Sequence, residues 1–147
     1  MRIGELARQS LCSVATIRYY EREGLLPEAL RDQANNYRDY THRHLETLMF
    51  IRRCRALDMA QDEIKRLLQA RSQPEAGCEV INQLIDEHRS HVQARITELV
   101  ELEKQLSELQ AFCHDNLPTR DCGILKELEQ PVSEAPLLTG KHISSTH

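Results

Sequence analysis

Three cysteines in the second half of the chain, Cys78, Cys113 and Cys122, have the residue type and spacing for metal chemistry. Thiolates select soft metal ions, and three sulfur ligands without a fourth disfavour the closed tetrahedral site of structural zinc. The alternative is that these thiols are buried as small apolar groups, a frequent fate of free cysteine. For the other two cysteines, Cys12 and Cys54, packing is the better interpretation because both fall on predicted helical core faces.

The segment between Cys78 and Cys113 predicts one long helix. Apolar residues recur at alternating steps of three and four, and no Gly or Pro interrupts them. This repeat is typical of a coiled coil, so the helix needs a partner to cover its apolar stripe. We interpret the polar residues His88 and Arg95 as setting the register of that pairing. The stripe comprises Cys78, Ile81, Ile85, His88, Val92, Arg95, Leu99, Leu102, Leu106, Leu109 and Cys113.

The length of this helix decides which thiols can share an ion. At ~1.5 Å per residue, Cys78 and Cys113 lie about 52 Å apart along one helix. In an antiparallel dimer, however, Cys78 of one chain lies beside Cys113 of the other, and Cys122 can fold back from the following loop. Two-fold symmetry then gives two three-thiolate sites. His114 follows Cys113 and is a candidate fourth donor, although a solvated loop histidine is the simpler interpretation.

The first part of the chain predicts a DNA-binding head. Residues 3–10 and 13–22 predict two short helices with a tight link, which is a helix-turn-helix pattern. Residues 31–40 predict a hairpin with Asn35 and Asn36 near its turn. Thr41 begins a further helix, and another follows near residues 60–70. In the helix after Thr41 the residues expected to point inward are Leu45, Leu48, Met49 and Ile51.

Charge is distributed unevenly along the chain. The formal net charge is −4, but residues 1–55 carry +3 and residues 76–147 carry −6. The first 64 residues contain no Lys, so every formal positive side-chain charge there is on Arg, whose guanidinium suits bidentate recognition of phosphate and guanine. On this observation alone, an ordinary solvated surface is the alternative. We interpret the chain as a basic head followed by an acidic rear.

Length and composition set the remaining bounds. The 147 residues suffice for one compact unit or two small ones. The sequence has neither an apolar stretch long enough for a membrane span nor the pattern of a secretory signal. We therefore expect a cytoplasmic protein with no membrane partner and with reduced cysteines. The predicted organisation is a head over residues 1–75, a dimerisation helix over 76–112, a metal-binding loop and short C-terminal helix over 113–130, and a flexible tail over 131–147.

Four segments of the head resemble the MerR family of metal-responsive transcription regulators. These segments are Ile3–Ala7, Thr16–Pro27, Asn36–Tyr40 and Phe50–Met59. The three cysteines, together with Cys122–Leu125 and Ile85–His88, look like the lead- and cadmium-responsive branch of that family (the PbrR/CadR type).

The resemblance implies a mainly α homodimer, in which winged helix-turn-helix heads are joined by a long antiparallel coiled coil. Such proteins bind double-stranded promoter DNA and repress without metal. With metal bound they activate transcription by RNA polymerase, because the DNA is bent and untwisted. The implied effector is Pb(II) or Cd(II), held by Cys78 of one chain and by Cys113 and Cys122 of the other. The implied targets are heavy-metal resistance genes.

Carried over by position, the resemblance places Arg18 and Tyr19 in the major groove. The whole implied DNA-contacting set is Thr16, Arg18, Tyr19, Tyr20, Arg31, Tyr37, Arg38 and Arg53, with Arg52 and Arg55 as alternatives to Arg53. The wing is one residue longer than usual, and Asn35 stands where relatives have Gly; Asn tolerates positive φ better than most residues. The tail offers only His142 and His147 for a second, weaker metal site.

Three other readings stay open at this point. A zinc- or mercury-responsive sensor of the same family would share much of the pattern, although zinc sensors usually offer more ligands. A thiolate dimer that sequesters metal would bind metal equally well without a promoter footprint. An enzyme is disfavoured, because the sequence has no Gly-rich phosphate loop and no convincing acid–base pair.

Overall fold

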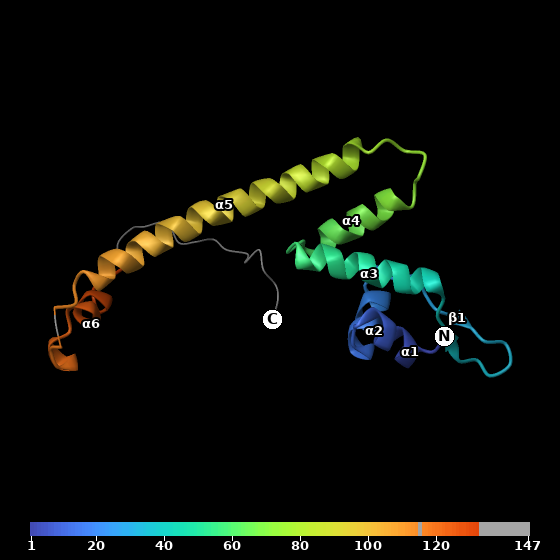
Figure 1. Ribbon diagram of the computed structural model, residues 1–147, viewed down its shortest axis with the longest axis horizontal. Coiled ribbons are helices and arrows are strands. Elements are labelled where there is room, and N and C mark those ends of the chain that lie inside the picture. Colours follow the sequence, from blue (N-terminus) through green and yellow to red (C-terminus); the bar gives the residue numbers. More distant parts are fainter. Residues whose placement is uncertain (115, 133–147) are drawn as a thin grey trace. The chain divides into compact units, whose positions relative to one another are not determined.

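The computed structural model describes residues 1–114 and 116–132 (Figure 1). They fall into two compact units, Met1–Asp86 and a second unit that begins at Glu87. The described residues are mainly helical, as predicted, and their only sheet is a two-stranded hairpin. None of their helices has the length and apolar character needed to cross a lipid bilayer. His142 and His147, with most of the predicted tail, lie outside the described residues.

The first unit opens with the predicted pair of short helices, α1 (Ile3–Ser10) and α2 (Val14–Arg22). Ser13 caps α2, since its Oγ accepts a hydrogen bond from the N–H of Thr16 at 3.0 Å. The link between the helices turns at Leu11, which has φ 57°. After α2 the chain turns at Gly24, whose φ of 78° is one that glycine adopts without strain.

A small hairpin follows, in which β1 (Leu30–Arg31) pairs antiparallel with β2 (Arg38–Asp39). The left-handed residue near its tip is Asn36, with φ 59°, and not Asn35. Asn35 instead accepts the N–H of Tyr37 on its Oδ1 at 3.0 Å, which is an Asx turn. The tip of the wing is therefore stabilised by a side-chain hydrogen bond.

Two further helices, α3 (His42–Ala56) and α4 (Gln61–Arg71), complete the head. Thr41 is the N-cap of α3, and its N–H donates to His44 Nδ1 at 3.0 Å. The prediction that Met49 points inward is wrong, because its side chain is 56% exposed. It follows Leu48 by one position, which rotates it about 100° away from the buried stripe.

The head has two apolar clusters, and the ring of Tyr20 packs against both. One joins the two-helix motif to the end of the wing and to α3, and its buried residues are Leu6, Ile17, Leu26, Tyr40, Leu45 and Leu48. The other joins α3, α4 and the first turns of α5, and its buried residues are Leu25, Ile51, Cys54, Met59, Ile64, Leu67 and Leu84. In Figure 1, α3 lies across α1 and α2.

The predicted long helix is confirmed as α5 (Glu79–Gln110), which is unbroken over 32 residues. It begins in the first unit and continues into the second. In a single chain several apolar residues of its predicted stripe are exposed, among them Leu99 at 48% and Leu106 at 62%. The second unit then forms a short 3₁₀ turn, η1 (Thr119–Asp121), and α6 (Gly123–Leu128).

Candidate DNA-binding surface and metal-binding cysteines

The structure gathers four of the predicted DNA-contacting residues around one hollow of about 430 Å³. Arg18 comes from α2, whereas Arg31, Tyr37 and Arg38 come from the wing. All four side chains belong to exposed residues. Arg2, Ile3 and Asn36 complete the lining. The wing and the second helix of the motif thus present their positive charges to the same space.

Three more of the predicted residues, Thr16, Tyr19 and Tyr20, line a second hollow of about 490 Å³. Its other lining residues are Leu25, Arg55, Ala60, Gln61 and Ile64. Burial raises the pKa of the Tyr20 hydroxyl, and the nearby Arg55 guanidinium partly opposes that rise. The phenol therefore stays a neutral hydrogen-bond donor at ordinary pH, as a contact to a phosphate oxygen would require.

The last predicted residue, Arg53, is exposed and lines neither of these two hollows. Among the three arginines considered for this contact, Arg55 lines the second hollow, and its Nη1 donates to the Met59 carbonyl at 3.0 Å. Arg52 is exposed, and its Nη1 donates to the Ser10 carbonyl at 3.1 Å, at the C-terminal end of α1. Arg55 is therefore better placed than Arg53 to act with Tyr20.

Sequence reasoning missed a contact between α2 and α4. The Tyr19 hydroxyl donates to Gln61 Oε1 at 2.9 Å, and Gln61 is the first residue of α4. Nearby, Lys65 Nζ donates to the Glu23 carbonyl at 3.3 Å. The orientation of Tyr19 is thus linked to the start of α4. A polar residue at a helix N-terminus gives no signal of its distant partner in the sequence.

The five cysteines differ in their exposure to solvent. Cys54 is buried and Cys12 is half-buried against the first cluster of the core, as expected for packing residues. Burial raises the pKa of the Cys54 thiol, which keeps it protonated and unreactive. Cys78 and Cys113 are exposed and Cys122 is half-buried. Two of the three predicted ligands, Cys78 and Cys113, are thus the most accessible thiols of the five.

Their positions along the fold follow from α5. Cys78 is the residue directly before α5 and belongs to the first unit, whereas Cys113 and Cys122 belong to the second. At ~1.5 Å per residue, α5 is about 48 Å long. The whole of α5 therefore separates Cys78 from Cys113 and Cys122 along one chain.

Within the second unit, the chain from Cys113 to Cys122 folds back on itself. A β-carbon at Gly123 would stand 2.1 Å from the carbonyl oxygen of Phe112 and 3.2 Å from its β-carbon. Phe112 precedes Cys113 and Gly123 follows Cys122, so this contact holds the two cysteines on neighbouring stretches of backbone. Figure 1 shows α6 folded back beside the C-terminal end of α5.

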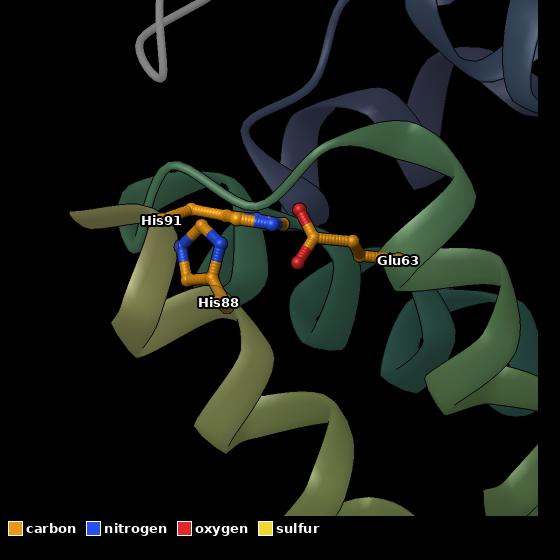
Figure 2. A group of neighbouring side chains, drawn as sticks. All are labelled: Glu63, His88 and His91. Atoms are coloured by element: carbon orange, nitrogen blue, oxygen red, sulfur yellow. The ribbon is translucent and has the colours of Figure 1, made fainter. Parts of the chain in front are cut away.

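The helix α5 carries two histidines near its N-terminal end, His88 and His91. Figure 2 shows the rings of His88 and His91 on the same side of α5, one turn apart. His88, on the predicted stripe, is only 8% exposed in a single chain, whereas Ile85 on the same stripe is 42% exposed. The role of His88 in setting the register stays a prediction.

A winged helix-turn-helix head on a long, incompletely covered helix defines a DNA-binding protein of the dimeric regulator class. The sequence matches the family model "MerR HTH family regulatory protein" over residues 1–71 and the model "MerR, DNA binding" over residues 45–109.

Individual relatives agree with this class. The chain is 44% identical over 109 residues to the HTH-type transcriptional regulator ZntR homolog of Haemophilus influenzae, covering 74% of this chain and 80% of that protein. It is 49% identical to the crystal structure of the transcription regulator PbrR691 from Ralstonia metallidurans CH34 in complex with lead(II), with TM-score 0.80 and coverage of 87% and 98%. It is 28% identical to MerR from Bacillus megaterium MB1 in complex with mercury(II), with TM-score 0.71 and coverage of 88% and 100%.

The chain belongs to the MerR family of metal-responsive transcriptional regulators. Regulators of this family bind promoter DNA, act with RNA polymerase and assemble as dimers. A second copy can therefore cover the exposed apolar residues of the predicted stripe on α5, such as Leu99 and Leu106.

Proposed function

We propose that the effector of this regulator is a soft divalent metal ion, Pb(II) or Cd(II), and that Cys78 of one protomer binds it together with the partner's Cys113 and Cys122. The contact between Gly123 and Phe112 is the observation that carries the proposal, because it holds the backbone next to Cys113 and Cys122 together. The length of α5 keeps Cys78 of the same chain at the far end of the helix. An antiparallel partner supplies the missing third thiol.

The donor set suits this class of metal. Three thiolates give a soft and electron-rich site, which favours lead, cadmium or mercury over hard cations that prefer oxygen ligands. Cys78 and Cys113 are exposed in a single chain, so they are accessible to a partner. The similarity to a lead-bound regulator favours lead among these ions.

On the DNA side, we propose that the two hollows of the head bind the promoter. Arg18 and Tyr19 would face base edges, and the wing arginines Arg31 and Arg38 would hold phosphates. Metal binding at the ends of α5 would shift the dimer between two arrangements of its heads, and the deformation of the DNA would convert that shift into activation of heavy-metal resistance genes. Acting on promoter DNA implies that the protein works in the cytoplasm.

Zinc and mercury are the alternative effectors, favoured respectively by the likeness to a ZntR homolog and to a mercury-bound regulator. A competitive titration of the reduced protein with Pb(II), Cd(II), Hg(II) and Zn(II), followed by thiolate-to-metal charge transfer in the ultraviolet, separates them. The proposal predicts lead binding that persists in excess zinc and is lost in Cys78→Ser. Equal or better zinc binding, or no loss in Cys78→Ser, contradicts it.

The same titration is paired with transcription from the protein's own promoter. We expect Cys113→Ser to retain promoter binding and to lose metal-dependent activation. A dimer that only sequesters metal would instead bind lead without protecting any promoter sequence. Cys12→Ser is the matched control, since this thiol packs in the head and should leave both metal binding and activation unchanged.

A further inference from the structure

Arg2 precedes the first helix of the head, outside both the helix-turn-helix and the wing. Its side chain nevertheless lines the same hollow as Arg18, Arg31 and Arg38. Four arginines, from the start of the chain, from α2 and from both strands of the wing, therefore line one hollow of about 430 Å³.

The structure fixes the place of Arg2 through several contacts with the wing. The backbone next to it is anchored because the Tyr40 N–H donates to the Met1 carbonyl at 2.8 Å. The Arg2 guanidinium carbon lies 4.9 Å from the centre of the Tyr37 ring, which is a cation–π contact. Arg2 Nη1 also donates weakly to the Arg38 carbonyl at 3.4 Å.

The charge around this hollow is strongly positive. Two carboxylates interact with Arg2. Asp32 Oδ2 lies 4.0 Å from Arg2 Nη2, and both side chains are substantially exposed, whereas Asp39 is paired with the N-terminal amine at 2.8 Å. An exposed ion pair such as Arg2–Asp32 is weak at 4.0 Å, so the Arg2 guanidinium remains able to bind a second anion. Planar guanidinium groups match the oxygens of a phosphodiester, and four arginines line this hollow.

We propose that Arg2 is a further DNA-contacting residue, which binds a backbone phosphate in this hollow and, through the Tyr37 ring, holds the wing in its DNA-binding position. This inference rests on the proposed DNA-binding surface. Because a phosphate contact carries no base information, Arg2 adds affinity equally for promoter and for unrelated duplex.

The test compares Arg2→Ala, Arg2→Lys and the control Arg8→Ala in the full-length dimer, by titrating fluorescent promoter duplex and a scrambled duplex of equal length at several KCl concentrations. Arg8 is an exposed arginine of α1 that pairs with Glu5, so its removal changes the net charge of the head by the same amount. Circular dichroism and thermal unfolding establish that each variant is folded.

We expect Arg2→Ala to weaken binding to both duplexes about five- to tenfold, with a salt slope smaller by about one phosphate contact per head. Arg2→Lys should restore the slope but only part of the affinity, because an ammonium loses the planar contact with Tyr37. An Arg2→Ala variant that binds both duplexes like Arg8→Ala, with an unchanged slope, would overturn the inference. The variant Arg18→Ala distinguishes failure of the Arg2 inference from failure of the proposed DNA-binding surface. If Arg18→Ala still discriminates between promoter and scrambled duplex, the proposed DNA-binding surface is refuted.

Discussion

The backbone of Gly123 packs against the carbonyl oxygen of Phe112 so closely that a β-carbon at position 123 would stand 2.1 Å from that oxygen. No side chain can be accommodated at this separation without moving the backbone, because a carbonyl oxygen is not a flexible side-chain end. The two residues flank the pair Cys113 and Cys122, so the position of one thiol relative to the other depends on a glycine.

Gly123→Ala should therefore separate the two thiols and lower the affinity for lead or cadmium by about 10–100-fold, the range seen when groups that orient metal ligands are changed. Promoter binding by the metal-free protein should be unaffected, because the head is a separate compact unit. Gly77→Ala is the matched control: it neighbours Cys78, but a β-carbon there meets nothing within 4 Å. Isothermal titration with each metal makes the comparison, and equal affinities in the two variants would refute the role of Gly123.

The hydrogen bond from Tyr19 to Gln61 can be tested for a role in orienting Tyr19 toward DNA. Removing the hydrogen-bond acceptor by Gln61→Ala leaves the Tyr19 hydroxyl without its 2.9 Å partner, so the ring can take other orientations. We expect promoter affinity to fall about three- to tenfold, as for the loss of one hydrogen bond, with weaker discrimination against base changes in the promoter. Gln69→Ala, at an exposed position of the same helix, should bind like the wild type. Unchanged discrimination in Gln61→Ala would show that this contact does not orient Tyr19 for DNA.

The dimer interface is tested at two apolar residues of α5 that are almost equally exposed in a single chain, Leu106 at 62% and Val100 at 63%. Leu106 lies on the predicted heptad stripe and Val100 lies off it. Leu106→Glu should produce monomers at concentrations where the wild type is dimeric, since it would bury an unpaired carboxylate between the helices. Val100→Glu should stay dimeric. Light scattering after gel filtration distinguishes them, and monomers from Val100→Glu alone would show that the register is wrong.

The buried hydroxyl of Tyr40 should make the free energy of unfolding depend on pH above 10. Burial and a hydrogen bond to Glu21 raise the pKa of its hydroxyl from 10.0 to about 12. Because the pKa of Tyr40 is higher in the folded chain than in the unfolded chain, its contribution to the free energy of unfolding is fully present below pH 10, where the phenol is protonated in both states. As pH rises from 10 to 12 the unfolded chain ionises first, and the free energy of unfolding falls by up to about 1.4 kcal/mol per pH unit.

Urea titrations across this pH range should show that additional fall in the wild type and not in Tyr40→Phe. Tyr37→Phe, at an exposed ring on the wing, serves as the control and should follow the wild type. If Tyr40→Phe loses stability with pH as steeply as the wild type does, the buried phenol is not the cause.

Much of this fold could be predicted from the sequence because its signals are local. The repeat of apolar residues over α5, the Ser13 cap of α2 and the three thiols each lie within one element or at its ends. The residues of the proposed DNA-binding surface came from a family resemblance, and seven of the eight line one of the two hollows.

What the sequence did not predict depends on contacts between distant segments. Arg2 reaches the wing because Tyr40 pairs with the start of the chain, and Tyr19 meets Gln61 only once α2 and α4 are packed. Leu84 lies off the heptad stripe, yet it is buried in the core of the head. The Asn36 turn likewise depends on which of two adjacent asparagines supplies the side-chain hydrogen bond.

The central claim, that each metal site takes Cys78 from one chain and Cys113 and Cys122 from the other, is tested most directly with mixed dimers. Cys78→Ser and Cys113→Ser chains carrying different tags are coexpressed, and the heterodimer is purified through both tags and titrated with lead under reducing conditions. Each mutant homodimer should lack tight binding, whereas the heterodimer should bind one ion per dimer, because one complete three-thiolate site is restored across the chains. A heterodimer that binds no better than the two homodimers would contradict the cross-chain site.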